Sequence, residues 1–227
     1  MLQKQKSFLV KGRQATLYTG SIAGAPLVVL NTYTGNGESI VRELAELGAP
    51  ECSLLVVGNL NWNHDMTPWP CPSLSANDTP FTGGAEEYLR LLHSEILPRT
   101  LDHLAESPAW IGIAGYSLAG LFAIWTMHVC DTFGRAASMS GSLWFPGFLR
   151  FIEENEPMRR PSRIYFSLGD KEAETKNMLL CTVRDNTTTA VSYYRALGLD
   201  VKWELNPGNH FKDCSLRTAR GIKAILD

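Results

Sequence analysis

Ser117 stands in the segment Gly-Tyr-Ser-Leu-Ala-Gly at residues 115–120, between an apolar run and a second apolar stretch. A serine placed between a predicted strand and a predicted helix is typical of a nucleophile held on a sharp, strained turn, which requires small flanking residues. Gly115, Ala119 and Gly120 are small, although Ala119 departs by one methyl group from the pattern G-x-S-x-G. We therefore predict that Ser117 is a catalytic nucleophile.

A serine hydroxyl needs a base at neutral pH, and His210 is the histidine best placed to act as one. It follows an apolar run at 201–205, in the segment Pro-Gly-Asn-His-Phe at 207–211. The chain order nucleophile, acid, histidine is that of α/β-hydrolases, which places the histidine near the C-terminus. Of the other histidines, one lies in a long loop and could line the site, and three fall within helical patterns typical of packing or surface residues: His64 in the loop, then His93, His103 and His128.

The acid that orients the histidine is expected between these two residues in the chain, after the apolar run at 164–168. That run ends in Gly-Asp-Lys-Glu at 169–172, where both Asp170 and Glu172 could stabilise a charged imidazole. Glu172 is preferred because it lies three residues past the glycine, the usual offset of this acid in such hydrolases. The carboxylate that is not used is then expected to be a solvated loop residue.

Acyl transfer also needs N–H donors for the oxyanion of the tetrahedral intermediate. The N–H of Leu118 is the first candidate, because it lies at the N-terminus of the predicted helix, where the helix dipole favours negative charge. A second donor normally comes from the loop after an earlier strand, which makes the backbone of Thr32 or Tyr33 the candidate. The alternative is that residues 31–33 merely turn the chain.

The elements that must position these residues follow from the alternation of apolar runs with helix-like stretches. This alternation predicts an α/β fold with a mostly parallel central sheet flanked by helices. Strands are predicted at 27–30, 54–57, 110–114, 136–139, 164–168 and 201–205, after an N-terminal antiparallel hairpin of 7–10 and 14–18. Helices are predicted through 40–47, from about 88 to about 98, and over 119–129, 182–197 and 216–226. Residues 59–84 are rich in Pro, Asn, Trp and Gly and predict a long loop of functional character.

The composition is that of an ordinary globular protein, with 44% hydrophobic and 19% charged residues among 227. A net charge of −2 gives no electrostatic support for binding nucleic acid or an anionic membrane surface. No apolar run approaches the roughly 20 residues that cross a bilayer. No linker or repeat is visible, so residues 1–227 are expected to form a single domain without a large lid.

The remaining sequence signals bear on location, cofactors and assembly. The N-terminal residues lack the pattern of a secretion signal, which favours a cytoplasmic location. The five cysteines are scattered and fit neither a disulfide framework nor a zinc site. No metal and no organic cofactor is expected, the expected partner is a small-molecule ester, and the sequence does not specify an oligomeric state.

At this point the chain resembles the putative-esterase family of α/β-hydrolases, which includes siderophore esterases, esterase D-like hydrolases, and feruloyl or acetyl esterases. The resemblance rests on the segments at 115–120 and 208–211, on Ser-Gly-Ser-Leu-Trp at 140–144 and on Asp-Met-Thr-Pro-Trp-Pro at 65–70. The last two are similar to the siderophore-esterase branch. The resemblance implies that Ser117, Glu172 and His210 form a catalytic triad.

The residues expected to border a substrate are aromatic or imidazole side chains of these segments and of the long loop: Tyr116, Trp144, His64 and Trp69. Core packing is the alternative for the two tryptophans. No cluster of Arg or Lys near the motifs indicates an anionic siderophore.

Together these residues predict a serine esterase that cleaves the carboxylic ester of a small molecule through an acyl-enzyme on Ser117. Two alternatives use the same fold. One is an acyltransferase that employs the same three residues, and the other is a binding protein without turnover.

Overall fold

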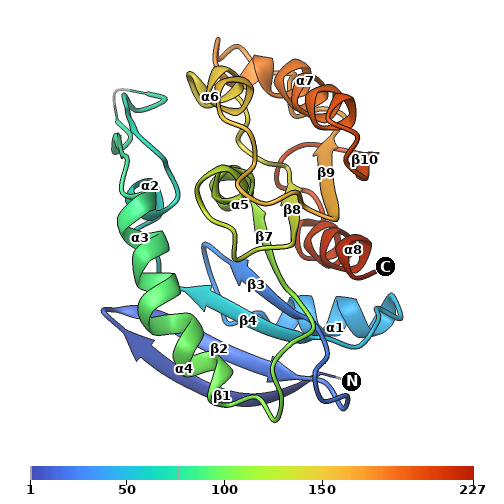
Figure 1. Ribbon diagram of the computed structural model, residues 1–227. Helices are drawn as coiled ribbons and strands as arrows, with labels where there is room; N and C mark the ends of the chain where they lie inside the picture. Colours follow the sequence, from blue (N-terminus) through green and yellow to red (C-terminus); the bar gives the residue numbers. More distant parts are fainter. Residues whose placement is uncertain (1, 76) are drawn as a thin grey trace.

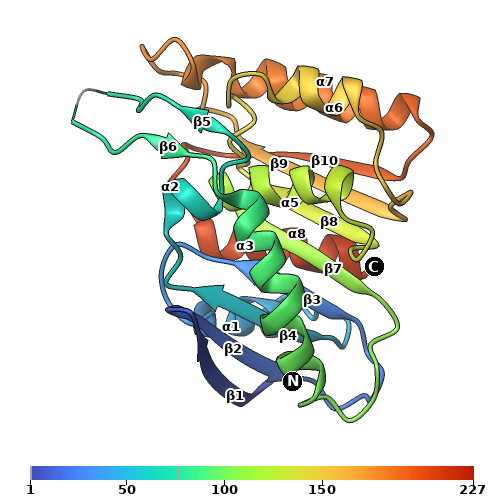
Figure 2. The ribbon, with the colours of Figure 1, turned by 60° about the vertical axis from the view of Figure 1, so that its left-hand side comes forward.

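The computed structural model describes residues 2–75 and 77–227. In this part of the chain, eight strands form one sheet in the order β1-β2-β4-β3-β7-β8-β9-β10 (Figures 1 and 2). They are β1 (Gln3–Val10), β2 (Arg13–Thr19), β3 (Leu27–Asn31), β4 (Ser53–Gly58), β7 (Ile111–Tyr116), β8 (Arg135–Met139), β9 (Arg163–Gly169) and β10 (Val201–Asn206). Neighbours from β4 to β10 are parallel, whereas β2 is antiparallel to both β1 and β4. The predicted sheet and hairpin are confirmed.

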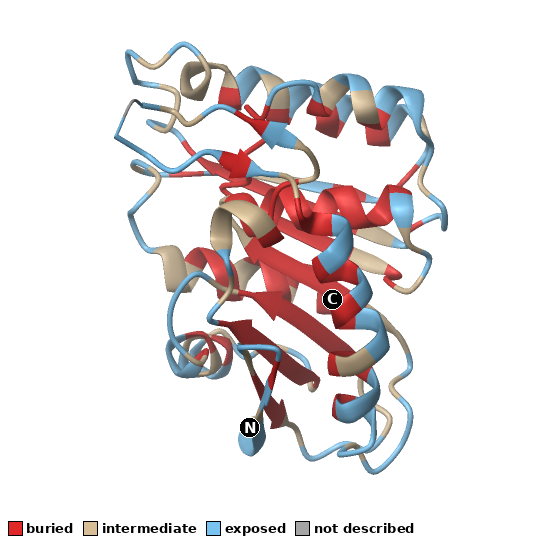
Figure 3. Cartoon of the chain, turned by 90° about the vertical axis from the view of Figure 1, so that its left-hand side faces the viewer, coloured by how far each residue is buried: buried red, intermediate tan, exposed pale blue. Residues whose placement is uncertain are grey.

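Helices cover both faces of the sheet. They are α1 (Glu38–Glu46), α2 (Trp62–Asp65), α3 (Ala85–Leu91), α4 (Leu97–Leu101), α5 (Leu118–Val129), α6 (Phe148–Glu154), α7 (Val183–Ala196) and α8 (Cys214–Leu226). Alternate strand residues point to opposite faces, so Val29 and Leu55 belong to a buried cluster that also contains residues of α3, α5 and α7, and Val28 and Leu54 belong to a second cluster with residues of α1 and α8. The central strands are therefore buried on both sides (Figure 3), which explains their continuous apolar sequences.

Two helical segments differ from the prediction. The helix expected to end near Pro98 continues to Leu101, because a π-helical turn, η1 (Leu92–Ile96), precedes α4 and places the proline in the first turn of α4. The chain stays helical through this turn, because the N–H of Leu97 bonds to the carbonyl of Leu92, five residues earlier. The sequence analysis also missed α6.

The segment 59–84 is more ordered than a plain loop. It contains α2 and a short antiparallel pair, β5 (Pro70–Cys71) with β6 (Phe81–Thr82). Asp65 is buried at the end of α2 and accepts two hydrogen bonds from Arg13 of β2, at 2.7 Å from Nη2 and 3.0 Å from Nε. This two-point ion pair fixes the segment to the sheet.

No helix in the described part of the chain is long and apolar enough to span a bilayer.

His128 of α5 is a buried histidine with both ring nitrogens hydrogen-bonded. Nδ1 contacts the carbonyl oxygen of Asn155 at 2.5 Å, and Nε2 contacts the Tyr194 hydroxyl at 2.6 Å. Since a carbonyl only accepts, Nδ1 carries the proton and Nε2 accepts from the tyrosine. Burial lowers the pKa of His128 to about 4, so the ring is neutral in the folded protein at neutral pH.

We expect this histidine to make the protein less stable in mild acid. In the unfolded chain it takes up a proton near its ordinary pKa of 6.5, whereas the folded protein resists protonation until about pH 4. The contribution of the neutral His128 ring to the free energy of unfolding is therefore fully present above pH 6.5 and is lost as the pH falls toward 4. The loss is about 2 kcal/mol at pH 5. Urea unfolding of the wild type and of His128→Gln at pH 5 and 7.5 measures it. The stability difference between the two proteins should shrink at pH 5, and a pH-independent difference contradicts the assignment.

Candidate active site

Ser117 lies on the turn between β7 and α5 in an unusual backbone conformation, with φ of 61° and ψ of −125°. Such values are costly for a residue with a side chain and persist only where the surroundings impose them. The backbone of Ser117 is held by its N–H, which donates to the carbonyl of Met139 at 3.1 Å, and by its own carbonyl, which accepts from the N–H groups of Gly120, Leu121 and Ser142 at 2.9, 3.1 and 3.0 Å. These bonds fix the serine at the carboxyl end of the sheet.

The steric demands of the turn fall on Gly115 and Gly120. A Cβ atom at Gly115 would lie 2.3 Å from the backbone C and O of Ala119, and one at Gly120 would lie 2.9 Å from the Cα of Gly141. Ala119 is fully buried, and its methyl group fits because Gly115 has no side chain in that space. The alanine in place of the last glycine of G-x-S-x-G is thus accommodated.

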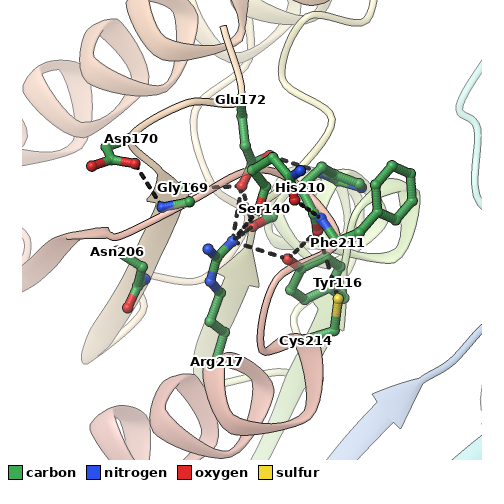
Figure 4. A network of polar contacts seen from close by, with 12 residues as sticks. Tyr116, Ser140, Gly169, Asp170, Glu172, Asn206, His210, Phe211, Cys214 and Arg217 are labelled. Carbon is green, nitrogen blue, oxygen red and sulfur yellow. Dashed lines mark hydrogen bonds and ion pairs between the residues drawn. The ribbon is translucent and has the colours of Figure 1, made fainter. Parts of the chain in front are cut away.

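The structure brings together three of the side chains that the sequence singled out. His210 follows β10, and its Nε2 lies 3.1 Å from the Oγ of Ser117. Its Nδ1 lies 2.7 Å from Oε2 of Glu172, which follows β9 (Figure 4). Because Nδ1 donates to the carboxylate, the unprotonated Nε2 faces the serine hydroxyl. This arrangement can remove a proton from Ser117.

The side chain of Glu172 is only 3% exposed. Burial alone would raise its pKa, but hydrogen bonds from His210, Ser140 and the N–H of Gly169 outweigh burial and hold the pKa below the usual value. Oε1 accepts from the Ser140 hydroxyl and from the Gly169 N–H, both at 2.6 Å, which leaves Oε2 for His210. The carboxylate is therefore ionised at neutral pH.

Asp170, the alternative acid, does not contact His210, and this part of the prediction is corrected. Its Oδ1 accepts a hydrogen bond from the N–H of Gly208 at 2.6 Å, so it fastens the loop that leads to the histidine. The chain turns after Gly169, whose carbonyl accepts from the N–H of Glu172 at 3.2 Å. This turn brings Glu172 to His210 and leaves Asp170 exposed.

The structure also reduces the number of backbone N–H groups that could donate to an oxyanion. Leu118 is the first residue of α5, so its N–H has no partner within the helix. The N–H of Thr32 already donates to the carbonyl of Val57 at 2.9 Å, so the prediction that Thr32 could donate to an oxyanion is wrong. Within the described residues the N–H of Tyr33 makes no backbone hydrogen bond, and Tyr33 lines the same cleft as Ser117. Leu118 and Tyr33 remain the candidates.

Ser117 and His210 open into a cleft of about 1080 Å³, a size suited to a small-molecule ligand. Of the residues expected to border a substrate, Tyr116 and Trp144 line this cleft. The Tyr116 hydroxyl is turned away from a ligand, since it donates to the carbonyl of His210 at 2.7 Å. Trp144 is almost fully buried and packs against Phe81.

His64 and Trp69 do not line the cleft, and both predictions are wrong. Trp69 packs among aromatic rings of the α6 region, with ring centroids 5.5 to 6.5 Å apart, and its Nε1 donates to the carbonyl of Pro146 at 2.9 Å. His64 bonds through Nδ1 to the Thr82 hydroxyl at 2.7 Å, and its Nε2 lies 3.7 Å from Glu87. Both side chains fix the segment 59–84 rather than face a substrate.

Sequence reasoning missed Arg217, Ser140 and Ser142. Ser142 lines the cleft, with its Oγ 3.4 Å from that of Ser117, while Ser140 and Arg217 contact Glu172. A signal for Arg217 exists in the sequence, because it shares the apolar face of α8 with Gly221 and other buried residues. A charged residue on such a face requires a buried partner.

Among residues 2–75 and 77–227, no group of three or more His, Cys, Asp or Glu side chains is arranged to hold a metal ion.

Comparison with known proteins identifies the family to which this chain belongs. A family model described as "Putative esterase" matches residues 31–198. The chain belongs to this family. It is therefore an esterase, as the sequence analysis predicted, and its sheet and the strand-to-helix turn at Ser117 are those of the α/β-hydrolase fold.

Individual relatives are more distant. The uncharacterized protein YbbA of Bacillus subtilis (strain 168) is 27% identical over 173 residues, which are 71% of this chain and 68% of that protein. An IroE-like serine hydrolase from Shewanella oneidensis superposes with a TM-score of 0.79 at 19% identity, over 99% of this chain and 79% of that one. The siderophore hydrolase EstA from Aspergillus nidulans superposes with a TM-score of 0.70 at 17% identity, over 99% and 94% of the two chains. At such identities the superpositions show a shared fold.

Proposed function

We propose that the esterase cleaves a carboxylic ester of a small molecule through an acyl-enzyme on Ser117. The observation that carries the proposal is the position of His210, whose ring bridges the Ser117 hydroxyl at 3.1 Å and the Glu172 carboxylate at 2.7 Å. Nucleophile, base and orienting acid within hydrogen-bond reach are what two-step acyl transfer requires.

In the first step Ser117 Oγ forms a bond to the carbonyl carbon of the ester, and its proton moves to Nε2 of His210. The oxyanion is stabilised by the N–H groups of Leu118 and Tyr33. Collapse of the intermediate breaks the bond to the alkoxy oxygen, and His210 gives its proton to the departing alcohol. Glu172 stabilises the imidazolium that exists between these events.

In the second step a water molecule takes the place of the alcohol. His210 removes one of its protons as the oxygen bonds to the acyl carbon, and the bond from that carbon to Ser117 Oγ then breaks. His210 returns the proton to the serine, and the carboxylic acid leaves. Mass spectrometry of protein quenched during turnover of a slowly hydrolysed ester should find the acyl group on the peptide that contains Ser117. An active enzyme that forms the adduct on another residue contradicts the mechanism.

The charges of the cleft favour a neutral or cationic ester. Three carboxylates line it, namely Glu38, Asp78 and Glu172, and none of its described lining residues is a lysine or an arginine. Glu38 and Asp78 are exposed, so their field acts through water and is modest and sensitive to salt. An anionic acyl or alcohol group would meet the exposed carboxylates of Glu38 and Asp78, with no lysine or arginine among the described lining residues to offset them.

We expect this field to give esters of similar size but different charge different values of kcat/KM. At low salt, kcat/KM for a neutral butyrate ester should exceed that for the anionic hemisuccinate ester of the same alcohol by about three- to tenfold. The ratio should shrink in 0.5 M NaCl and in Glu38→Gln. Glu46→Gln is the matched control, because it removes a carboxylate from the same helix α1 but away from the cleft. Faster cleavage of the hemisuccinate would rule out this selectivity.

A further inference from the structure

Arg217 of α8 is a buried cation next to Glu172, with a side chain that is 1% exposed. Its Nη1 lies 3.2 Å from Oε1 of Glu172, 3.3 Å from the Tyr116 hydroxyl and 3.4 Å from the Ser140 hydroxyl (Figure 4). Nη1 also donates to the carbonyl of Asn209 at 3.1 Å, and Nη2 donates to the carbonyl of Pro207 at 2.9 Å. No described carboxylate other than Glu172 forms an ion pair with it.

These partners come from four neighbouring strands. Tyr116 ends β7, Ser140 follows β8, Glu172 follows β9, and the loop 207–209 follows β10. Beyond the strand ends the continuous ladder of the sheet gives way to isolated hydrogen bonds between these segments, such as that from the N–H of Lys171 to the carbonyl of Gly208 at 3.2 Å. Nη1 of one guanidinium contacts all four of these segments, and Nη2 adds a second contact to the loop 207–209.

The contacts of Arg217 approach His210 from two directions. On one side, Arg217 occupies Oε1 of Glu172 together with Ser140, so that the carboxylate presents Oε2 to the imidazole. On the other side, the Tyr116 hydroxyl accepts from Arg217 and donates to the backbone carbonyl of His210. Burial raises the pKa of Tyr116, so its hydroxyl keeps the proton that this bond uses.

We infer that Arg217 is a positioning residue for catalysis, which fixes the Glu172 carboxylate and the loop of His210 in the geometry that proton transfer needs. The inference rests on the proposed function, since a positioned base matters only if Ser117 is the nucleophile. Arg217 does not line the cleft and is not expected to touch substrate.

The test compares Arg217→Met with Arg220→Met. Arg220 lies on the same helix, is about two-fifths exposed, and contacts Asn206 and Glu204 rather than the site. We expect Arg217→Met to lower kcat by about 10²-fold with little change in KM, as misplaced catalytic groups do. Active sites are counted by fluorophosphonate labelling, so that a smaller folded fraction is not mistaken for slower chemistry.

The pH profile separates positioning from a merely structural role. The titratable groups next to the guanidinium are Glu172 and Tyr116, with His210 and Cys214 beyond them. Without Arg217 the Glu172–His210 pair loses a nearby positive charge and holds a proton to higher pH, so the acid limb of kcat/KM should move upward. In Arg220→Met both kcat and the limb should be unchanged. A purely structural residue would lower the number of labelled sites and leave the limb in place.

Arg217→Lys keeps the buried charge but not the fork of donors, and it serves if Arg217→Met does not fold. We expect an intermediate loss in kcat and a smaller shift of the limb. A folded Arg217→Met or Arg217→Lys with the wild-type kcat and profile overturns the inference, and so does failure of both to fold, which would assign Arg217 to stability alone. If instead the wild type turns over esters without labelling at Ser117, the proposed function is at fault.

Discussion

Replacing Ser117 by alanine is expected to lower kcat/KM for a short 4-nitrophenyl ester by at least about 10³-fold. The variant lacks the oxygen that would bond to the acyl carbon, and only the oxyanion donors and the binding cleft remain to assist attack by water. Initial rates of 4-nitrophenolate release measure the loss. The acyl adduct should also be absent from the quenched variant. Activity within tenfold of the parent would show that the nucleophile lies elsewhere.

Ser142→Ala is the matched control for this experiment. The two hydroxyl groups are 3.4 Å apart and line the same cleft, but His210 is hydrogen-bonded to that of Ser117. The control removes a neighbouring oxygen of the same chemistry and should cost tenfold or less. If Ser142→Ala lost activity as completely as Ser117→Ala while still forming the adduct, Ser142 would have a part in deacylation that the mechanism above does not include.

Replacing Glu172 by glutamine should lower kcat by about 10²- to 10⁴-fold, the range expected when the acid of such a relay loses its charge. An amide cannot stabilise the imidazolium as a carboxylate does, and its NH₂ group can hold the ring in the wrong tautomer. The change also leaves the buried cation of Arg217 without its carboxylate, which costs about 3–5 kcal/mol of stability. Urea unfolding and active-site labelling therefore accompany the rate measurement.

Asp170→Asn is the control for the position of the acid. Asp170 is two residues away in sequence, and its oxygen accepts only from the N–H of Gly208 among the hydrogen bonds found in the described structure. The amide oxygen of asparagine can accept the same bond, so kcat should change by a few-fold at most. Equal losses in Asp170→Asn and Glu172→Gln would contradict the assignment of the relay to Glu172.

The sequence predicted those features that local pattern encodes. Buried strands such as β3 and β4 have continuous apolar, β-branched sequences, and the small residues around Ser117 mark the turn directly. The order of Ser117, Glu172 and His210 along the chain then follows from the order of the parallel strands, whose carboxyl ends meet at one edge of the sheet.

What the sequence did not predict depends on packing between distant segments. Asp170 and Glu172 are separated only by the way the chain turns after β9, and Thr32 is excluded as an oxyanion donor only by its hydrogen bond to Val57. His64 and Trp69 were misassigned because their partners, Thr82 and the rings of α6, lie on other segments of the chain. No local pattern specifies such contacts.

The fit of Ala119 in the turn at Ser117 has a consequence for recognising other sequences of this kind. Positions 115 and 120 have no room for a side chain, whereas position 119 already holds one. A search signature that insists on glycine two residues after the serine therefore tests the wrong position. A better signature requires glycine two residues before the serine and three residues after it, and allows alanine two residues after it. These requirements match the positions where the structure has no room for a side chain.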